Sequence, residues 1–167
     1  MKLAARSLTR AFHDGSNLPA REDLCAAALF SGMALANAKL GAVHGLAGVL
    51  GGVTGHPHGA ICARLLPLVM ETNIEALRSR GAASSSMARY DEVARILTGE
   101  PAAIAADGVA WARTLCASLD IPPLPVSGLS ASEIALVVAT SQRASSMQGN
   151  PVQLTEGELM AILEAAQ

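Results

Sequence analysis

Residues 41–73 decide the fold of this chain and read GAVHGLAGVLGGVTGHPHGAICARLLPLVMETN. Glycine recurs there at positions 41, 45, 48, 51, 52, 55 and 59. This density of glycine either permits close helix contact and tight turns or leaves the backbone open to a ligand. Three of the four histidines, His44, His56 and His58, lie in the same stretch. Its second half is helical in character over 60–80, and we expect Pro67 to kink or restart that helix.

The composition around this stretch favours an all-α fold. The chain has 167 residues, of which 33 are alanine and only four are aromatic. Small aliphatic residues favour closely packed helices, and the strand formers of a β-sandwich are too sparse. With 51% hydrophobic residues and a net charge of -2, the chain is also unlike a disordered protein. We therefore expect a single helical domain over 1–167.

Charge and cysteine usage limit the partners and the compartment. A near-neutral chain with few aromatic residues offers no footprint for nucleic acid. The three cysteines, Cys25, Cys62 and Cys116, are an odd number without CxxC spacing, and no secretory pattern precedes them, so we expect the cytoplasm. The longest uncharged run, 40–63, contains seven glycines and Pro57, and we therefore expect no membrane span.

Apolar spacing and helix signals predict the remaining elements. The segment 21–39 is expected to be helical. Its middle is apolar nearly all round, which is typical of a buried helix, and we expect it to be the central element of the core. Gly81 and the alanines and serines after it indicate a loop, and 147–151 another. Further segments are expected to be helical over 87–97 and from 101 to about 119, and extended over 121–126.

Two capping boxes mark the start of the last two helices. Ser130 and Glu133 form the first box, and Thr155 and Glu158 form the second. Each is flanked by a pair of apolar residues with the spacing of a hydrophobic staple. The sequence therefore predicts helices over about 131–143 and 156–166.

The clustered histidines are the chemical centre of the sequence. Imidazole suits iron, zinc, copper or nickel, and a metal needs ligands that converge from different elements. His44 on a helix and His58 after a glycine-rich turn could meet in this way. Isolated histidines are nevertheless more often ordinary surface or core residues, and two of them are too few for a stable site.

The same stretch resembles the second signature of the iron-containing (group III) alcohol dehydrogenases. The match preserves His44 and, after thirteen intervening residues, His58 within Pro57-His58-Gly59. Leu-Leu-Pro-x-Val-Met-x-x-Asn follows over 65–73. Further similarity lies at 119–122, at 144–151 and in the closing helix from Leu154. The likeness covers essentially the whole chain.

This resemblance implies the all-helical, metal-binding C-terminal domain of such an enzyme, a dehydroquinate synthase-like helical domain. In the family this domain faces an N-terminal α/β domain that binds NAD(P). The metal, Fe²⁺ or Zn²⁺, is held there by an Asp-x-x-x-His helix and two later histidines that match His44 and His58. The resemblance assigns no catalytic or nucleotide-binding residue to this chain.

The chain also departs from the family pattern. It contains no Asp-x-x-x-His and no glycine-rich nucleotide turn, so we expect the nucleotide-binding domain to be absent and the protein to be truncated or split. Such a chain is expected to be inactive alone and to use NAD(P) only when an upstream nucleotide-binding domain or subunit is supplied. Many members carry a further histidine where this chain has Gly48. His56 is extra, and we interpret it as a surface residue that could substitute as a ligand.

Two other hypotheses stay open from the sequence. The chain could be a non-enzymatic helical module whose former domain interface mediates self-association, and a homo-oligomer is expected in either case. Alternatively, His44, His56 and His58 could form an autonomous metal site. Cys62 lies in an apolar run and is interpreted as a small buried hydrophobic residue rather than a thiol ligand or nucleophile.

Overall fold

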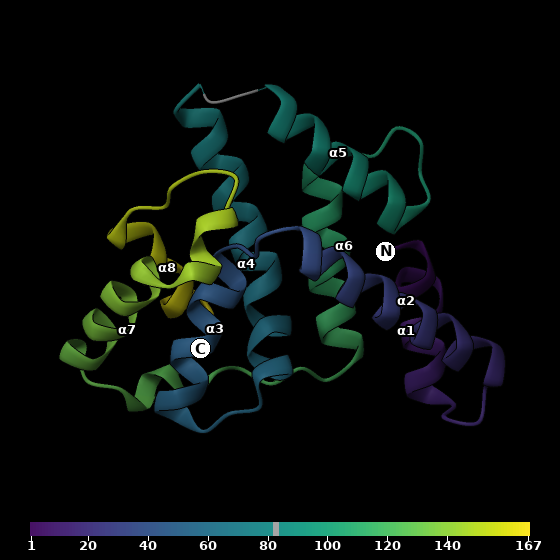
Figure 1. Ribbon diagram of the computed structural model, residues 1–167, viewed down its shortest axis with the longest axis horizontal. Helices are drawn as coiled ribbons and strands as arrows, with labels where there is room; N and C mark the ends of the chain where they lie inside the picture. Colours follow the sequence, from purple (N-terminus) through teal and green to yellow (C-terminus); the bar gives the residue numbers. More distant parts are fainter. Residues whose placement is uncertain (82–83) are drawn as a thin grey trace. The chain divides into compact units, whose positions relative to one another are not determined.

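The protein is described by a computed structural model that covers residues 1–81 and 84–167 (Figure 1). These residues form α-helices, two short 3-10 helices (η) and no strand, which confirms the all-α prediction. In chain order the elements are α1 (Lys2–His13), α2 (Leu18–Asn37), α3 (Ala42–Thr54), α4 (His58–Ser79), α5 (Ser84–Thr98), α6 (Ala105–Ser118), η1 (Pro125–Gly128), α7 (Ala131–Arg143), η2 (Ser145–Gly149) and α8 (Glu156–Ala165).

The described residues fall into two compact units. The first comprises Met1–Ala38 and Met87–Asp120, and the second comprises the described part of Lys39–Ser86 together with Ile121–Gln167. All three histidines of the glycine-rich stretch lie in the second unit. The single domain predicted over 1–167 stays a prediction.

The second unit is a bundle built around α3 and α4, which pack against each other (Figure 1). Helix α7 packs on α3, and α8 packs on both α4 and α7. Their facing side chains are fully or almost fully buried, and removing such aliphatic area from water is the main stabilising term. Large members of this core include Leu46, Leu50, Ile61, Leu65, Leu159, Ile162 and Leu163.

Both predicted capping boxes are present at the starts of α7 and α8. The Ser130 and Thr155 hydroxyls accept hydrogen bonds from the backbone amides of Glu133 and Glu158, and each glutamate side chain accepts one from the backbone N–H of its cap. Arg80, which follows α4, pairs with Glu158 at 2.6 Å. Helix α8 thus begins where its capping box predicts, and Arg80 pairs with its first turn.

The first unit contains two pairs of closely packed helices. Helix α1 packs on α2, where Arg6 and Ser7 both hydrogen-bond the carboxylate of Asp23. A Cβ added at Gly108 on α6 would lie 3.2 Å from the Cα of Ala94 on α5, which shows how closely these helices approach. This contact agrees with the close helix packing that the alanine-rich composition predicts.

The prediction of a buried central helix over 21–39 is wrong. Helix α2 forms, but Ala20 is its only buried residue, and Phe30 and Met33 are 59% and 57% exposed. Its apolar residues face every direction, whereas α1 packs along only one side of it within this unit.

Among the described residues, no single helix is long and apolar enough to cross a membrane. Helices α2 and α3, taken together as a bent pair, meet this criterion of length and composition.

Three local predictions also differ from the structure. Helix α4 continues through the buried Pro67, so the helix does not restart there, while the alternative expectation of a kink stays a prediction. The helix expected from Pro101 begins at Ala105, because the carboxylate of Asp107 accepts from the backbone N–H of Ile104 at 2.8 Å and that of Asp91 accepts from Ala105. Of the loop expected after Gly81, residues 82–83 lie outside the described part of the chain, and 84–86 form the first turn of α5.

Two short segments differ in detail as well. The extended segment ends at Leu124, since η1 begins at Pro125, and the expected loop at 147–151 includes the end of η2. The helix predicted over 87–97 is confirmed within α5, and Gly99 ends it with a left-handed φ of 79°.

Close approach of η2 to α3 explains two of the glycines in the second unit. A Cβ at the buried Gly45 would lie 2.8 Å from the Cε of Met147. A Cβ at Gly149 would lie 2.1 Å from the carbonyl oxygen of Leu40 and 2.7 Å from the Cβ of Lys39. Glycine at these positions therefore lets η2 pack directly against the start of α3.

The G149A variant tests this close approach. Because the added methyl group collides with backbone, we expect the free energy of unfolding to fall by about 1–3 kcal/mol. The matched control is G157A on α8, where an added Cβ meets nothing within 4 Å and alanine is the better helix former. Urea unfolding of both variants measures the difference; equal stability of G149A and the unmodified chain would contradict the packing of η2.

The Asp23 cluster gives a prediction about pH. Hydrogen bonds from Arg6 first, and then from Ser7, lower the pKa of Asp23 to about 2. A carboxyl group whose pKa is lower in the folded state stabilises that state above its unfolded pKa of about 3.9. This contribution is lost as the pH falls from about 4 towards 2. The α1–α2 pair should therefore loosen in that range.

NMR titration of the Asp23 carboxyl carbon measures this shift directly. We expect R6A to raise the pKa of Asp23 markedly towards the ordinary value of about 3.9. R10A, on the same helix, should raise it less because Arg10 contributes only a minor Coulombic effect. A pKa of Asp23 near 3.9 in the unmodified chain would show that the pair does not form.

Candidate metal centre

His44 lies in the first turn of α3. Gly41 is the N-cap, and its carbonyl accepts hydrogen bonds from the backbone amides of His44 and Gly45 at 3.1 and 3.0 Å. The side-chain oxygen of Asn150 accepts from the backbone N–H of Ala42 at 3.0 Å. An amide from a distant part of the chain thus supplies the missing cap at the helix end that carries His44.

His58 is the first residue of α4. Helix α3 ends at Gly55, whose left-handed φ of 68° reverses the chain, and Pro57 is the N-cap of the next helix. The backbone N–H of His56 in this turn donates to the hydroxyl of Thr54 at 3.3 Å. Glycine at the turn and proline before the helix therefore fix the place where His58 begins α4.

The structure brings the rings of His44 and His58 together. Their centroids are 5.6 Å apart, and the rings are tilted by 51°. Burial lowers the pKa of His44, and the nearby charge of His58 lowers it further. Both effects favour the neutral imidazole, which is the form that binds a metal. That these two residues bind a metal stays a prediction.

Cys62 is a third donor beside the pair. It lies one helical turn after His58 on α4, and its Sγ is 3.4 Å from the Nε2 of His58. The side chain is half-buried rather than buried as expected, and burial raises the pKa of its thiol. Within the described part of the chain, the candidate metal ligands that cluster are His44, His58 and Cys62, whose donor atoms all lie within 4.8 Å of one another.

His56 does not belong to this cluster. It lies partly buried in the turn between α3 and α4, and no ligand group found among the described residues includes it. No aspartate or glutamate joins the cluster in that part of the chain either. The fourth histidine, His13, is on α1 and stacks edge-on against Phe12.

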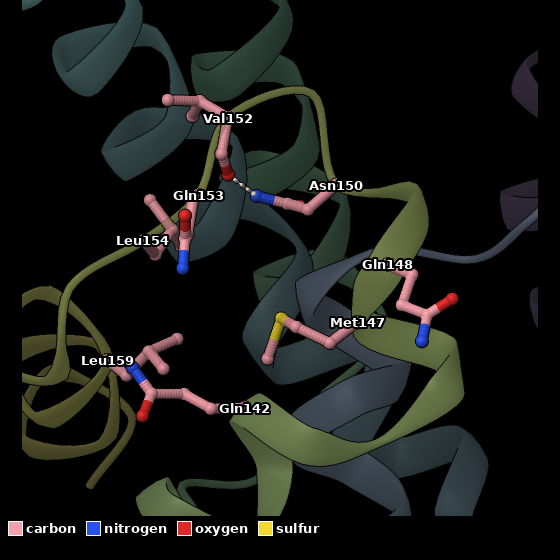
Figure 2. A pocket seen from close by; sticks show the side chains of 8 residues that line it. All are labelled: Gln142, Met147, Gln148, Asn150, Val152, Gln153, Leu154 and Leu159. Carbon is pink, nitrogen blue, oxygen red and sulfur yellow. Dashed lines mark hydrogen bonds between the residues drawn. The ribbon is translucent and has the colours of Figure 1, made fainter.

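A pocket in the second unit shares no lining residue with this cluster. It has a volume of about 320 Å³ and is lined by residues of α7, η2, the segment after η2 and α8 (Figure 2). Its polar lining consists of amide groups, including those of Gln142, Gln148 and Gln153, and none of the three cluster residues lines it. No titratable side chain lines the pocket.

Asn150 bonds both helices that carry the cluster, and the sequence did not predict this role. Its Oδ1 also accepts from the Nδ2 of Asn73 at 3.2 Å, and its own Nδ2 donates to the Oδ1 of Asn73 and to the carbonyl of Val152, both at 2.7 Å. The sequence signal was the Gly149-Asn150-Pro151 run, which by itself is sufficiently explained as a loop. Only the fold shows that this loop bonds both the start of α3, at Ala42, and the later part of α4, at Asn73.

The chain is similar to known proteins along its whole length. The sequence model of a protein family, described as "Fe-containing alcohol dehydrogenase family, C-terminal", matches residues 1–167. Alcohol dehydrogenase 4 of Saccharomyces cerevisiae is 32% identical over 165 residues, which are 98% of this chain and 41% of that protein. The 1,3-propanediol dehydrogenase of Klebsiella pneumoniae is 49% identical over 76 residues, which are 46% of this chain and 20% of that protein.

Solved structures agree with the sequence comparison. The crystal structure of a 1,3-propanediol oxidoreductase superposes with a TM-score of 0.85 at 30% identity and covers 99% of this chain. An alcohol dehydrogenase from Oenococcus oeni gives a TM-score of 0.84, also at 30% identity. This chain covers 43% of each of those chains, and it spans about two-fifths of the length of the relatives that match it throughout.

Proposed function

Because this chain belongs to the Fe-containing alcohol dehydrogenase family and matches its C-terminal region, we propose that it supplies the metal-binding half of an NAD(P)-dependent alcohol dehydrogenase. The enzyme would interconvert an alcohol and an aldehyde or ketone by hydride transfer. The observation that carries this proposal is the convergence of the His44 and His58 rings, with centroids 5.6 Å apart.

The residues present fit half of such a metal site. Two imidazole groups that approach from different helices are suitable donors for Fe²⁺ or Zn²⁺. A divalent metal held there supplies Lewis-acid polarisation of the substrate oxygen. In this proposal, His44 and His58 hold the metal, and the first turns of α3 and α4 orient the two rings.

The rest of the machinery lies outside these 167 residues in this proposal. The sequence contains no Asp-x-x-x-His and no glycine-rich nucleotide turn. A complementary domain or subunit would supply the remaining metal ligands, the NAD(P) site and the other wall of the substrate pocket. These 167 residues by themselves should then transfer no hydride.

A chimaera tests the proposed function. The chain is joined to the part of Saccharomyces cerevisiae alcohol dehydrogenase 4 that it does not match, and metal content and NAD(P)-linked oxidation of simple alcohols are measured. H44A and H58A should each lower bound metal and activity at least about tenfold, because losing a ligand costs no less than losing a residue that only orients one.

The control is H56A, because His56 lies in the same stretch but outside the cluster. This variant should keep both metal and activity. A chimaera that binds metal and oxidises alcohols equally well with and without His44 and His58 would contradict the proposal.

A second candidate function is self-association through α2. Four of its large apolar side chains, Leu29, Phe30, Met33 and Leu35, are more than half exposed. Large exposed apolar side chains that gather on one helix favour a protein-binding surface. We propose that this surface joins copies of the chain into a homo-oligomer, either alongside the enzymatic role or in place of it.

Light scattering with size separation tests this second candidate. We expect a molecular mass above 17.0 kDa that falls to the monomer value in the F30D/M33D double variant. L136D is the matched control, because Leu136 on α7 is 63% exposed and lies in the other unit. A monomeric unmodified chain across the accessible concentration range would refute self-association.

A further inference from the structure

The family resemblance does not account for Cys62. This residue is not one of the two matching histidines. It is half-buried and packs against the hydrophobic core, and its sulfur lies 3.4 Å from the Nε2 of His58. The spacing between His58 and Cys62 is four residues along one helix, which places both side chains on the same face. The same spacing presents two ligands to one zinc ion in helical metal sites.

The distances match what a tetrahedral ion requires. Zinc binds thiolate sulfur at about 2.3 Å and imidazole nitrogen at about 2.0–2.1 Å, so the sulfur and nitrogen of one site are about 3.6 Å apart. The observed separation of 3.4 Å is within a few tenths of this value. One donor atom from each of His44, His58 and Cys62 lies within 4.8 Å of the other two, so small side-chain movements would complete the geometry.

The positions of the three donors also suit an ion that arrives from solvent. His58 is exposed, and His44 and Cys62 are half-buried. His44 comes from α3, while His58 and Cys62 come from α4, and these helices pack against each other through a shared core. The protein therefore holds the ligands close together before a metal binds, which lowers the cost of ordering them.

We propose that His44, His58 and Cys62 form a three-ligand site for Zn²⁺ within this chain. On binding, the Sγ–H bond of Cys62 breaks, the proton passes to water, and the sulfur joins the ion together with the two imidazole nitrogens. The fourth position of the tetrahedron is left for water or a further oxygen or nitrogen donor. The inference rests on the two histidines of the proposed function and adds a donor that the family pattern does not provide.

The thiolate decides which metal is preferred. Two imidazoles and one thiolate form a softer donor set than imidazoles with a carboxylate, and soft sulfur donors favour zinc or cobalt over Fe²⁺. The chain would therefore bind zinc without a complementary domain. In the complete enzyme, the same sulfur would compete with the ligands of the other half.

Cobalt is the probe for this site, because it replaces zinc and reports its ligands by absorption. The 167-residue chain is titrated with Co²⁺ in the presence of a phosphine reductant. We expect one ion per chain, intense visible bands of a four-coordinate ion and a near-ultraviolet sulfur-to-cobalt charge-transfer band. C62S should lose the charge-transfer band, and its affinity for Zn²⁺, measured by chelator competition, should fall at least about tenfold.

The matched control is C25S, because Cys25 is an exposed cysteine on α2 in the other unit. This variant should keep the band and the affinity. A second measurement needs no variant: Zn²⁺ should protect Cys62 of the unmodified chain from alkylation while Cys25 still reacts, as peptide mapping shows. If C62S does not fold, this protection measurement decides whether Cys62 binds the ion.

Two results would overturn the inference of a three-ligand site, and neither would contradict the proposed function. Cobalt binding that depends on His44 and His58 but shows no charge-transfer band would mean that Cys62 is not a ligand. Absence of any cobalt binding would mean that the chain does not form a three-ligand site. In both cases, the chimaera still tests whether the two histidines serve a site completed by another domain.

Discussion

The side chain of Asn150 holds together the two helices that carry the candidate metal ligands. Its oxygen accepts from the start of α3 and from Asn73 on α4, and its nitrogen donates to Asn73 and to Val152. These bonds use both acceptor positions and both donors of a primary amide. Aspartate could not donate and alanine could not bond at all, so the chemistry of asparagine is required here. The placement of His44 relative to α4 depends on this amide and on the glycines that let η2 approach.

The site that results has two parts with different origins. In the proposed function, His44 and His58 provide nitrogen donors from two helices and form half of an enzyme's metal site. Cys62 lies on the same face of α4 as His58, and in the further proposal it adds a sulfur that changes the character of the donor set. Under these two proposals the chain would hold a soft divalent ion by itself or would contribute its two imidazoles to a larger assembly. The balance between the two roles would depend on which domain accompanies the chain.

Local signals in the sequence predict the fold better than signals that depend on distant partners. The Ser130 and Thr155 capping boxes predicted α7 and α8 closely, because each cap is satisfied within four residues. The start of α6 was misplaced because the carboxylate of Asp91, fourteen residues away, binds its first turn. The burial of α2 was overestimated because apolar residues on every face do not determine what will cover them. In the site, the approach of His44 to His58 was predictable from the sequence. The four-residue spacing from His58 to Cys62 was visible there but was not interpreted as a ligand pair. The role of Asn150 depends on contacts 77 and 108 residues away and could not be predicted.

In the proposed site, Asn150 and the turn at Gly55 direct the rings of His44 and His58 towards one shared ion. The decisive experiment is a crystal structure of the chain grown with Zn²⁺, with anomalous data on both sides of the zinc absorption edge. We expect one strong zinc peak within bonding distance, about 2.0–2.1 Å, of a nitrogen of each ring. Rings that point away from each other, or a zinc peak bound elsewhere with neither ring in contact, would contradict it.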